Sequence, residues 1–156
     1  MTQEEKQLLL KDLGARLQYK PHCCVFKLNG DIKENDDVLY GVIGDNVMTL
    51  KSDKDECLMY YQIKPYLRPM NSMTEEEVQE IRDRLNNISI GRTITKENFE
   101  KCCDFLWFTK MSSFECVSEK MMDVVIDYLD ENMFDHRGLI EKGLAIKDQK
   151  MLYICN

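Results

Sequence analysis

A chain of 156 residues has the length of one domain, or of a small domain with an appendage. Its composition, 44% hydrophobic and 31% charged, is that of a globular protein, and no apolar run approaches the ~20 residues needed to cross a bilayer. The start, MTQEEKQLLLKDL, is acidic and lacks the apolar stretch of a secretory signal. We therefore expect a cytoplasmic protein with no membrane partner.

The net charge of −7 is distributed unevenly along the chain. Residues 1–70 contain 10 Lys and Arg against 11 Asp and Glu, whereas residues 71–156 contain 11 against 17. An acidic surface repels phosphate backbones, so the second half is disfavoured as a nucleic-acid platform. The nearly neutral first half leaves nucleic acid open as a partner.

Seven cysteines are many for this length, but their spacing does not indicate a zinc site. Two adjacent pairs and three single residues occur: Cys23-Cys24, Cys102-Cys103, Cys57, Cys116 and Cys155. No C-x-x-C is present, the spacing with which two thiolates bind one zinc ion. We interpret all seven as free thiols that pack as small hydrophobic residues in a reducing cytosol.

The first predicted element is a short helix from Thr2 to Leu13. Thr2 and Glu5 have the spacing of a capping box, in which each side chain accepts a hydrogen bond from the other residue's backbone N–H. Leucines at helical spacing form one apolar stripe, and Gly14 is a suitable end for the helix.

From His22 to Leu67 the hydrophobic pattern alternates, as it does in strands. HCCVFKL is the first predicted strand, DDVLYGVIGDNVMTLKS is a hairpin that turns at residues 44–46, and ECLMYYQI is a further strand. Gly41 has the position of a bend or bulge. Short antiparallel strands with short connections remove their exposed edges by closing, so we predict a small SH3-like or Sm-like β-barrel over about residues 20–69.

Two prolines and a second capping box mark the end of the strand region. Pro65 and Pro69 cannot donate to a sheet ladder, so strand pairing should stop there. Thr74 and Glu77 then have the spacing that starts an acidic helix. Three further helices and one edge strand are predicted beyond it: Thr95–Phe108, Ser112–Leu129, HRGLIEKG capped by Asp135, and MLYIC.

These elements predict an α+β fold. Residues 1–70 form an N-terminal helix and a small antiparallel barrel, and residues 71–156 form an acidic C-terminal helical region. We expect the helical region to pack on the barrel as one compact unit.

Catalytic and metal chemistry have little support in the sequence. His22 lies beside Cys23, but neighbours on a strand point to opposite faces, so adjacency does not make a catalytic pair. His22 and Cys24 share a strand face and could supply two metal ligands, with no residue in the sequence that completes the site. No glycine-rich phosphate loop or dinucleotide motif occurs.

We therefore predict no catalytic residue, no metal, no cofactor and a protein that is not an enzyme. An enzyme would gain support if His22 or His136 converged with a cysteine and a carboxylate in one cleft.

The candidate binding residues are Tyr60, Tyr66, Arg68 and, more weakly, Arg137. Tyrosine and arginine are the residues most enriched at binding hot spots, and aromatic faces of small barrels bind peptides and single-stranded nucleic acid. The alternative is that the tyrosines pack the barrel with only their hydroxyl groups at solvent.

Three blocks of the sequence together resemble a family of small proteins of gut anaerobic bacteria, often found in phage-like or other mobile-element contexts. The blocks are EEKQLLLKDLGARLQY, IKPYLRPMNSMTEEE and FDHRGLIEKGLAI, which cover about a third of the chain and span its length. The chain departs from the family pattern at Gln18, where proline is common, and at His136, where an aromatic residue is usual. Residues from about 82 to 119 do not match the family pattern. The resemblance implies a family and no activity.

The strand pattern alone gives a likeness to SH3-like and Sm-like barrels, which cannot assign a function. We expect a non-enzymatic protein-interaction module, for example an accessory or regulatory protein of a phage or mobile element. The alternative is a nucleic-acid-binding barrel whose acidic helical half faces away from the ligand.

Overall fold

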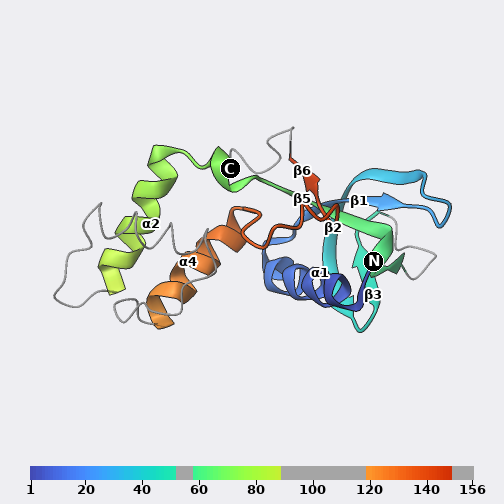
Figure 1. Ribbon diagram of the computed structural model, residues 1–156, viewed down its shortest axis with the longest axis horizontal. Helices are drawn as coiled ribbons and strands as arrows, with labels where there is room; N and C mark the ends of the chain where they lie inside the picture. Colours follow the sequence, from blue (N-terminus) through green and yellow to red (C-terminus); the bar gives the residue numbers. More distant parts are fainter. Residues whose placement is uncertain (52–57, 89–118, 149–156) are drawn as a thin grey trace. The chain divides into compact units, whose positions relative to one another are not determined.

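The computed structural model describes residues 1–51, 58–88 and 119–148, which Figure 1 shows in colour. The chain divides into two compact units: Met1–Pro69 with Asp130–Asn156, and Met70–Leu129. From the sequence, residues 71–156 are predicted to form one helical region. In the structure, the residues from Asp130 onward belong to the first unit. The chain therefore leaves the first unit after Pro69 and returns to it at Asp130.

The described residues of the first unit form a mixed sheet of six strands in the order β4-β3-β2-β1-β5-β6. Its elements are α1 (Gln3–Arg16), η1 (Leu17–Tyr19), β1 (His22–Phe26), β2 (Ile32–Ile43), β3 (Asn46–Thr49), β4 (Leu58–Met59), η2 (Tyr60–Gln62), β5 (Ile63–Leu67) and β6 (Ile146–Lys147). Neighbouring strands are antiparallel except β5 and β6, which are parallel. The α+β class predicted from the sequence is confirmed.

The closed SH3-like or Sm-like barrel is wrong, because the described strands form an open sheet with β4 and β6 at its ends. β5 pairs with the outer side of β1, with Cys23 opposite Pro65, and β6 then covers the other edge of β5. The other edge of β5 is thus covered by residues 130–148, which we call the returning segment, and the sheet does not close on itself. The prediction that strand pairing stops at Pro65 is wrong, because Pro65 lies inside β5 opposite Cys23. Alternate residues of a strand direct their N–H groups to opposite sides, so one residue without an N–H leaves the bonds of its neighbours possible.

The first helix begins as predicted and ends later. Thr2 and Glu5 form the capping box, with the Glu5 amide 3.1 Å from Thr2 Oγ1 and the Thr2 amide 2.7 Å from Glu5 Oε2. The helix passes Gly14 and continues to Arg16, which is fully buried and pairs with Asp12 one turn earlier. Arg16 also donates to the Phe134 carbonyl at 2.8 Å, a tertiary contact that anchors the last turn and outweighs the weak helix propensity of glycine.

The hairpin of β2 and β3 turns where the sequence predicts. Gly44 has φ +59°, a left-handed conformation that glycine adopts without steric cost. The pairing register shifts between Leu39 and Gly41, as the predicted bulge requires. The Met48 side chain covers Gly41 so closely that a Cβ atom there would displace it.

One apolar core lies beneath the sheet. It contains Leu9 and Leu13 of α1 together with residues of β1, β2, β3, β4, β5 and the returning segment: Cys23, Val25, Leu39, Val47, Leu58, Ile63, Leu67, Met133, Leu139, Leu144 and Ala145. The backbone of Arg68 is bracketed by the returning segment, because its N–H donates to Met133 O and its carbonyl accepts from the Asp135 amide, both at 2.7 Å. The returning segment is thus part of the core and of the sheet.

The returning segment contains turns instead of the predicted helix at HRGLIEKG. Asp135 therefore does not cap a helix; its carboxylate instead accepts hydrogen bonds from the Leu139 and Ile140 amides of the turns, at 2.7 and 2.9 Å. Gly138 and Gly143 both have positive φ, at +70° and +67°, which interrupts helical geometry.

The second unit contains η3 (Met70–Ser72), α2 (Glu75–Ile88) and most of α4 (Glu119–Glu131). The predicted capping box is confirmed: the Glu77 amide is 3.3 Å from Thr74 Oγ1, and the Thr74 amide is 2.8 Å from Glu77 Oε2. The Tyr128 hydroxyl donates to Glu80 at 3.3 Å, which links the two helices. The predicted helix from Thr95 to Phe108 and the predicted strand MLYIC lie outside the described residues, as does the start of the predicted helix from Ser112.

Candidate functional site

The residues that the sequence nominates for binding lie in separate environments of the first unit. Tyr66 is buried, and its hydroxyl donates to the backbone oxygen of Asn35 at 2.7 Å. Arg68 is buried with its guanidinium 4.2 Å from the centre of the Phe134 ring. Tyr60 is half-buried against the core. Tyr66 therefore packs inside the unit, as the alternative for the tyrosines expects, although its hydroxyl is bonded to Asn35. Arg68, for which only binding is predicted, is buried as well.

Arg137 belongs to a cluster of five ionisable side chains, which we call the ion-pair cluster: Asp12, Arg16, Asp130, His136 and Arg137. Arg16 donates to both oxygens of Asp12 at 2.9 and 3.0 Å, and its Nη2 lies 3.2 Å from Asp130 Oδ1. Arg137 donates to both oxygens of Asp130 at 2.6 and 3.0 Å and to Asp12 at 2.8 Å. His136 Nε2 lies 2.8 Å from Asp130 Oδ1.

The electrostatics of the ion-pair cluster favour the charged forms of Asp130 and Arg137. Burial alone would raise the pKa of Asp130, but hydrogen bonds from His136 and Arg137 and the charge of Arg16 hold that pKa well below its usual range. Burial alone would lower the pKa of Arg137, but its bonds to Asp130 and Asp12 raise it. Two arginines balance two aspartates at short range, so the cluster fastens α1 to the returning segment and leaves little capacity for a ligand.

A second polar group joins β1, β2 and β5. His22 Nδ1 lies 2.6 Å from Asp36 Oδ1, and the Cys24 thiol donates to Asn35 Oδ1 at 3.9 Å. A histidine, a carboxylate and a cysteine thus lie on adjacent strands, which the sequence could not show. Cys24 is only 1% exposed, however, so its sulfur is closed to a substrate.

Cys23, on the same strand, is fully buried, and that burial together with the Asp37 charge raises the pKa of its thiol. A protonated thiol is a poor nucleophile. Within residues 1–51, 58–88 and 119–148, no group of three or more His, Cys, Asp and Glu side chains could hold a metal ion.

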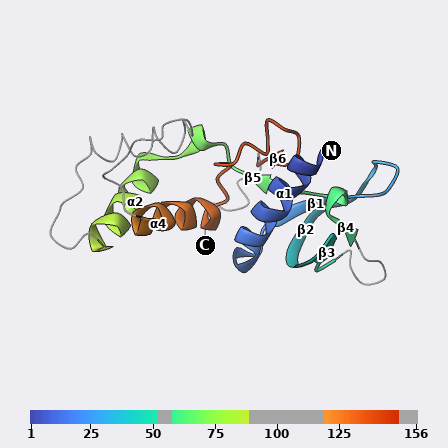
Figure 2. The ribbon, with the colours of Figure 1, turned by 60° about the horizontal axis from the view of Figure 1, so that its bottom comes forward.

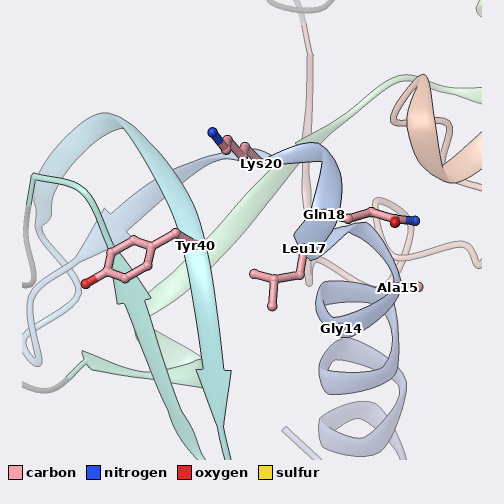
Figure 3. Close-up of a pocket in the computed structure, with 6 residues that line it drawn as sticks. All are labelled: Gly14, Ala15, Leu17, Gln18, Lys20 and Tyr40. Atoms are coloured by element: carbon pink, nitrogen blue, oxygen red, sulfur yellow. The ribbon is translucent and has the colours of Figure 1, made fainter.

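An open hollow of about 620 Å³ lies where the end of α1 faces β2. It is lined by Gly14, Ala15, Leu17, Gln18, Lys20 and Tyr40. Figure 3 shows Leu17 between the helix end and Tyr40, with Lys20 at the rim. Tyr40 is 44% exposed, whereas Leu17 packs partly against the core.

Local backbone geometry forms this hollow. The helix ends in the 3₁₀ turn η1, and Lys20 follows with φ +52°, a left-handed conformation that turns the chain into β1. Gly14 and Ala15 have little or no side chain, so they leave the helix side of the hollow open. The sequence does not indicate this site, because Tyr40 and the helix end are brought together only by the packing of α1 on the sheet.

No protein-family model, curated protein or solved structure matches the chain. In the described part of the chain, no helix has the length and apolarity to cross a bilayer.

Proposed function

We propose that the chain is a non-enzymatic protein-interaction module that binds its partner through the hollow at Tyr40. The family resemblance suggests the role of an accessory or regulatory protein of a phage or mobile element. The observation that carries the proposal is the partly exposed Tyr40 ring beside a hollow whose walls are a helix end and a strand.

The chemistry of the hollow suits a protein ligand. Tyrosine supplies a large contact area with few rotatable bonds, which explains its enrichment at hot spots. Leu17 offers an apolar floor that is held by the core, so little order must be gained on binding. Lys20, exposed at the rim, favours a partner with a carboxylate near its apolar anchor.

The proposal against an enzyme rests on the two thiols in β1. Cys24 has almost no exposed surface and Cys23 has none, and the pKa of the Cys23 thiol is raised. The His22–Asp36 pair therefore lacks an accessible partner nucleophile among these two residues.

The test compares two variants of the purified chain used as bait in an extract of a host bacterium. Tyr40→Ala removes the proposed anchor, and Ile43→Ala removes a 66%-exposed residue of the same strand that does not line the hollow. A protein captured by the parent chain and by Ile43→Ala, but not by Tyr40→Ala, is then produced and titrated directly. We expect Tyr40→Ala to weaken that binding by about tenfold or more.

Salt separates the nucleic-acid alternative from this proposal. Binding through phosphate contacts should fall by orders of magnitude between about 50 and 200 mM salt, whereas an apolar protein contact should largely persist. Equal loss in both variants, or binding that nuclease treatment abolishes, would refute the protein-binding hollow.

A further inference from the structure

The hairpin between β1 and β2 ends in an apolar tip. Both ribbon views show this hairpin projecting from the sheet of the first unit (Figures 1 and 2). Leu28 is 79% exposed and Ile32 is 55% exposed. Phe26, the cross-strand partner of Ile32, is half-buried. Two large aliphatic side chains so open to water on one short loop require an explanation beyond the fold.

The tip is a preformed structure. The Lys27 amide donates to Asp31 O at 2.7 Å, and the Gly30 amide donates to Lys27 O at 2.9 Å. Asn29 donates to the Asp31 carboxylate at 2.7 Å and accepts from the Asp31 amide at 3.1 Å. The turn residues thus satisfy one another, and the exposure of Leu28 is held in place by the backbone.

Basic side chains accompany the apolar ones. Lys27, next to Leu28, is exposed, and so is Lys33, next to Ile32. The Lys64 ammonium lies 5.8 Å from the centre of the Phe26 ring. Of the carboxylates near the tip, Asp31 accepts from the neutral Asn29 amide and keeps its charge, whereas Glu34 lies 3.8 Å from the Lys51 ammonium. The basic groups Lys27, Lys33 and Lys64 thus outnumber Asp31 at the tip.

We propose that this tip, comprising Phe26, Leu28 and Ile32 with Lys27 and Lys64, docks on an anionic lipid surface. A convex tip cannot enclose a ligand, so it must enter another phase or another molecule. Aliphatic side chains enter the boundary between headgroups and acyl chains, while lysines beside them contact anionic headgroups. The sequence expectation of no membrane partner depended on the lack of a spanning segment, which docking of this kind does not need.

Charge complementarity favours lipid over an apolar pocket in a protein. A bilayer interface accepts apolar side chains below the headgroups while an adjacent ammonium group stays among the headgroups, because the flexible lysine stem extends toward them. The chain carries a net charge of −7, so attachment through two apolar residues should be weak and reversible. This inference uses a different surface from the hollow at Tyr40 and does not rest on the proposed function.

Sedimentation of the full chain with vesicles tests the docking. One vesicle preparation contains equimolar phosphatidylcholine and phosphatidylglycerol, and the other contains phosphatidylcholine alone. We expect binding to the mixed vesicles and weaker binding to the neutral ones. The double variant Leu28→Ser/Ile32→Ser should lose about tenfold or more in affinity, because two aliphatic groups no longer leave water.

Two matched variants identify the cause of any loss. Ile43→Ser removes a 66%-exposed aliphatic residue at the other end of β2 and should bind like the parent chain. Lys27→Gln should weaken binding to the mixed vesicles and leave binding to the neutral ones unchanged. Leu28→Trp, made in a chain whose own tryptophan is replaced (Trp107→Phe), adds a direct readout, because indole emission from an inserted tip shifts to shorter wavelength when vesicles are added.

Three results would overturn the proposal. The parent chain could fail to sediment with either vesicle, the Leu28→Ser/Ile32→Ser variant could bind as well as the parent, or the Leu28→Trp emission could stay unchanged. If the Leu28→Ser/Ile32→Ser variant sediments with vesicles like the parent chain but no longer captures a protein that the parent captures, the tip contacts a protein and the lipid proposal is refuted.

Discussion

Replacement of Arg16 by methionine tests whether the ion-pair cluster holds the first unit together. Arg16 and Asp12 are both fully buried, and Asp130 is 3% exposed. Methionine retains most of the apolar stem, so the main cost is electrostatic. Asp12 loses two charged hydrogen bonds, at 2.9 and 3.0 Å, and keeps the bond from Arg137.

The size of the effect follows from these contacts. A hydrogen bond to a charged group contributes about 1.5–3 kcal/mol, and Arg16 also donates to the backbone oxygen of Phe134 at 2.8 Å. Removing one partner of a buried ion pair costs about 3–5 kcal/mol, because the other charge stays buried. Since domains unfold with about 5–15 kcal/mol, Arg16→Met should remove a large share of the stability of this unit.

The assay is urea denaturation of the full chain, followed by NMR signals of the Val25 and Leu39 amides. These residues lie in β1 and β2, so they report on the first unit alone. Lys11→Met is the matched control, because Lys11 is exposed on the same helix and its loss should change the free energy of unfolding by no more than about 0.5 kcal/mol. An Arg16→Met effect no larger than this control would refute the role of the cluster.

Three further predictions concern pH, thiols and backbone. Because the pKa of Asp130 is lower in the folded than in the unfolded chain, its contribution to the free energy of unfolding is present above about pH 4 and is lost as the pH falls. In urea melts, the free energy of unfolding of Asp130→Asn should therefore differ most from that of the parent chain at neutral pH and converge with it in acid. Iodoacetamide labelling read by peptide mass spectrometry should modify Cys23 and Cys24 only in unfolded protein, and fast labelling of either in the native chain would contradict their burial. Gly44→Ala should lower the free energy of unfolding by about 1 kcal/mol because φ is positive at Gly44. Gly14→Ala, inside α1 with open space around it, should raise the free energy of unfolding by about 0.5–1 kcal/mol. Changes of the same sign in the two variants would refute the backbone argument.

Local features of the fold could be predicted from the sequence because their causes lie within a few residues. Both capping boxes depend on a side chain and an amide three positions apart, and both are present at Thr2 and Thr74. The turn at Gly44 depends on the positive φ that glycine tolerates. The strand pattern is local as well, but it does not indicate whether the two edge strands of a sheet pair with each other. The pattern alone therefore predicts a closed barrel, whereas the sheet is open with β4 and β6 at its edges.

The candidate sites could not be predicted because each depends on contacts between distant segments. Arg137 was selected for its residue type, whereas its partner Asp12 is 125 positions away. Asp12 and Arg16 have the i,i+4 spacing of a helical ion pair, but the predicted helix ends at Leu13, so the sequence does not place Arg16 beside Asp12. The hollow gave no signal, because Tyr40 alternates in its strand like any outward residue.

The long sequence separations have a consequence for folding. Arg16 donates to the Phe134 carbonyl, 118 positions later. The backbone of Arg68 is hydrogen-bonded to Met133 and Asp135, on either side of Phe134. The core, the β5 edge and the charges of Asp12 are therefore satisfied only after residues 130–148 have been made. Contacts of such separation require loop closure before they stabilise anything, which slows folding. Truncation before Asp130 should thus leave the buried Arg16 without Asp130 and Phe134, and should leave one edge of β5 unpaired. The ion-pair cluster therefore makes the return of the chain a condition for the stability of the first unit.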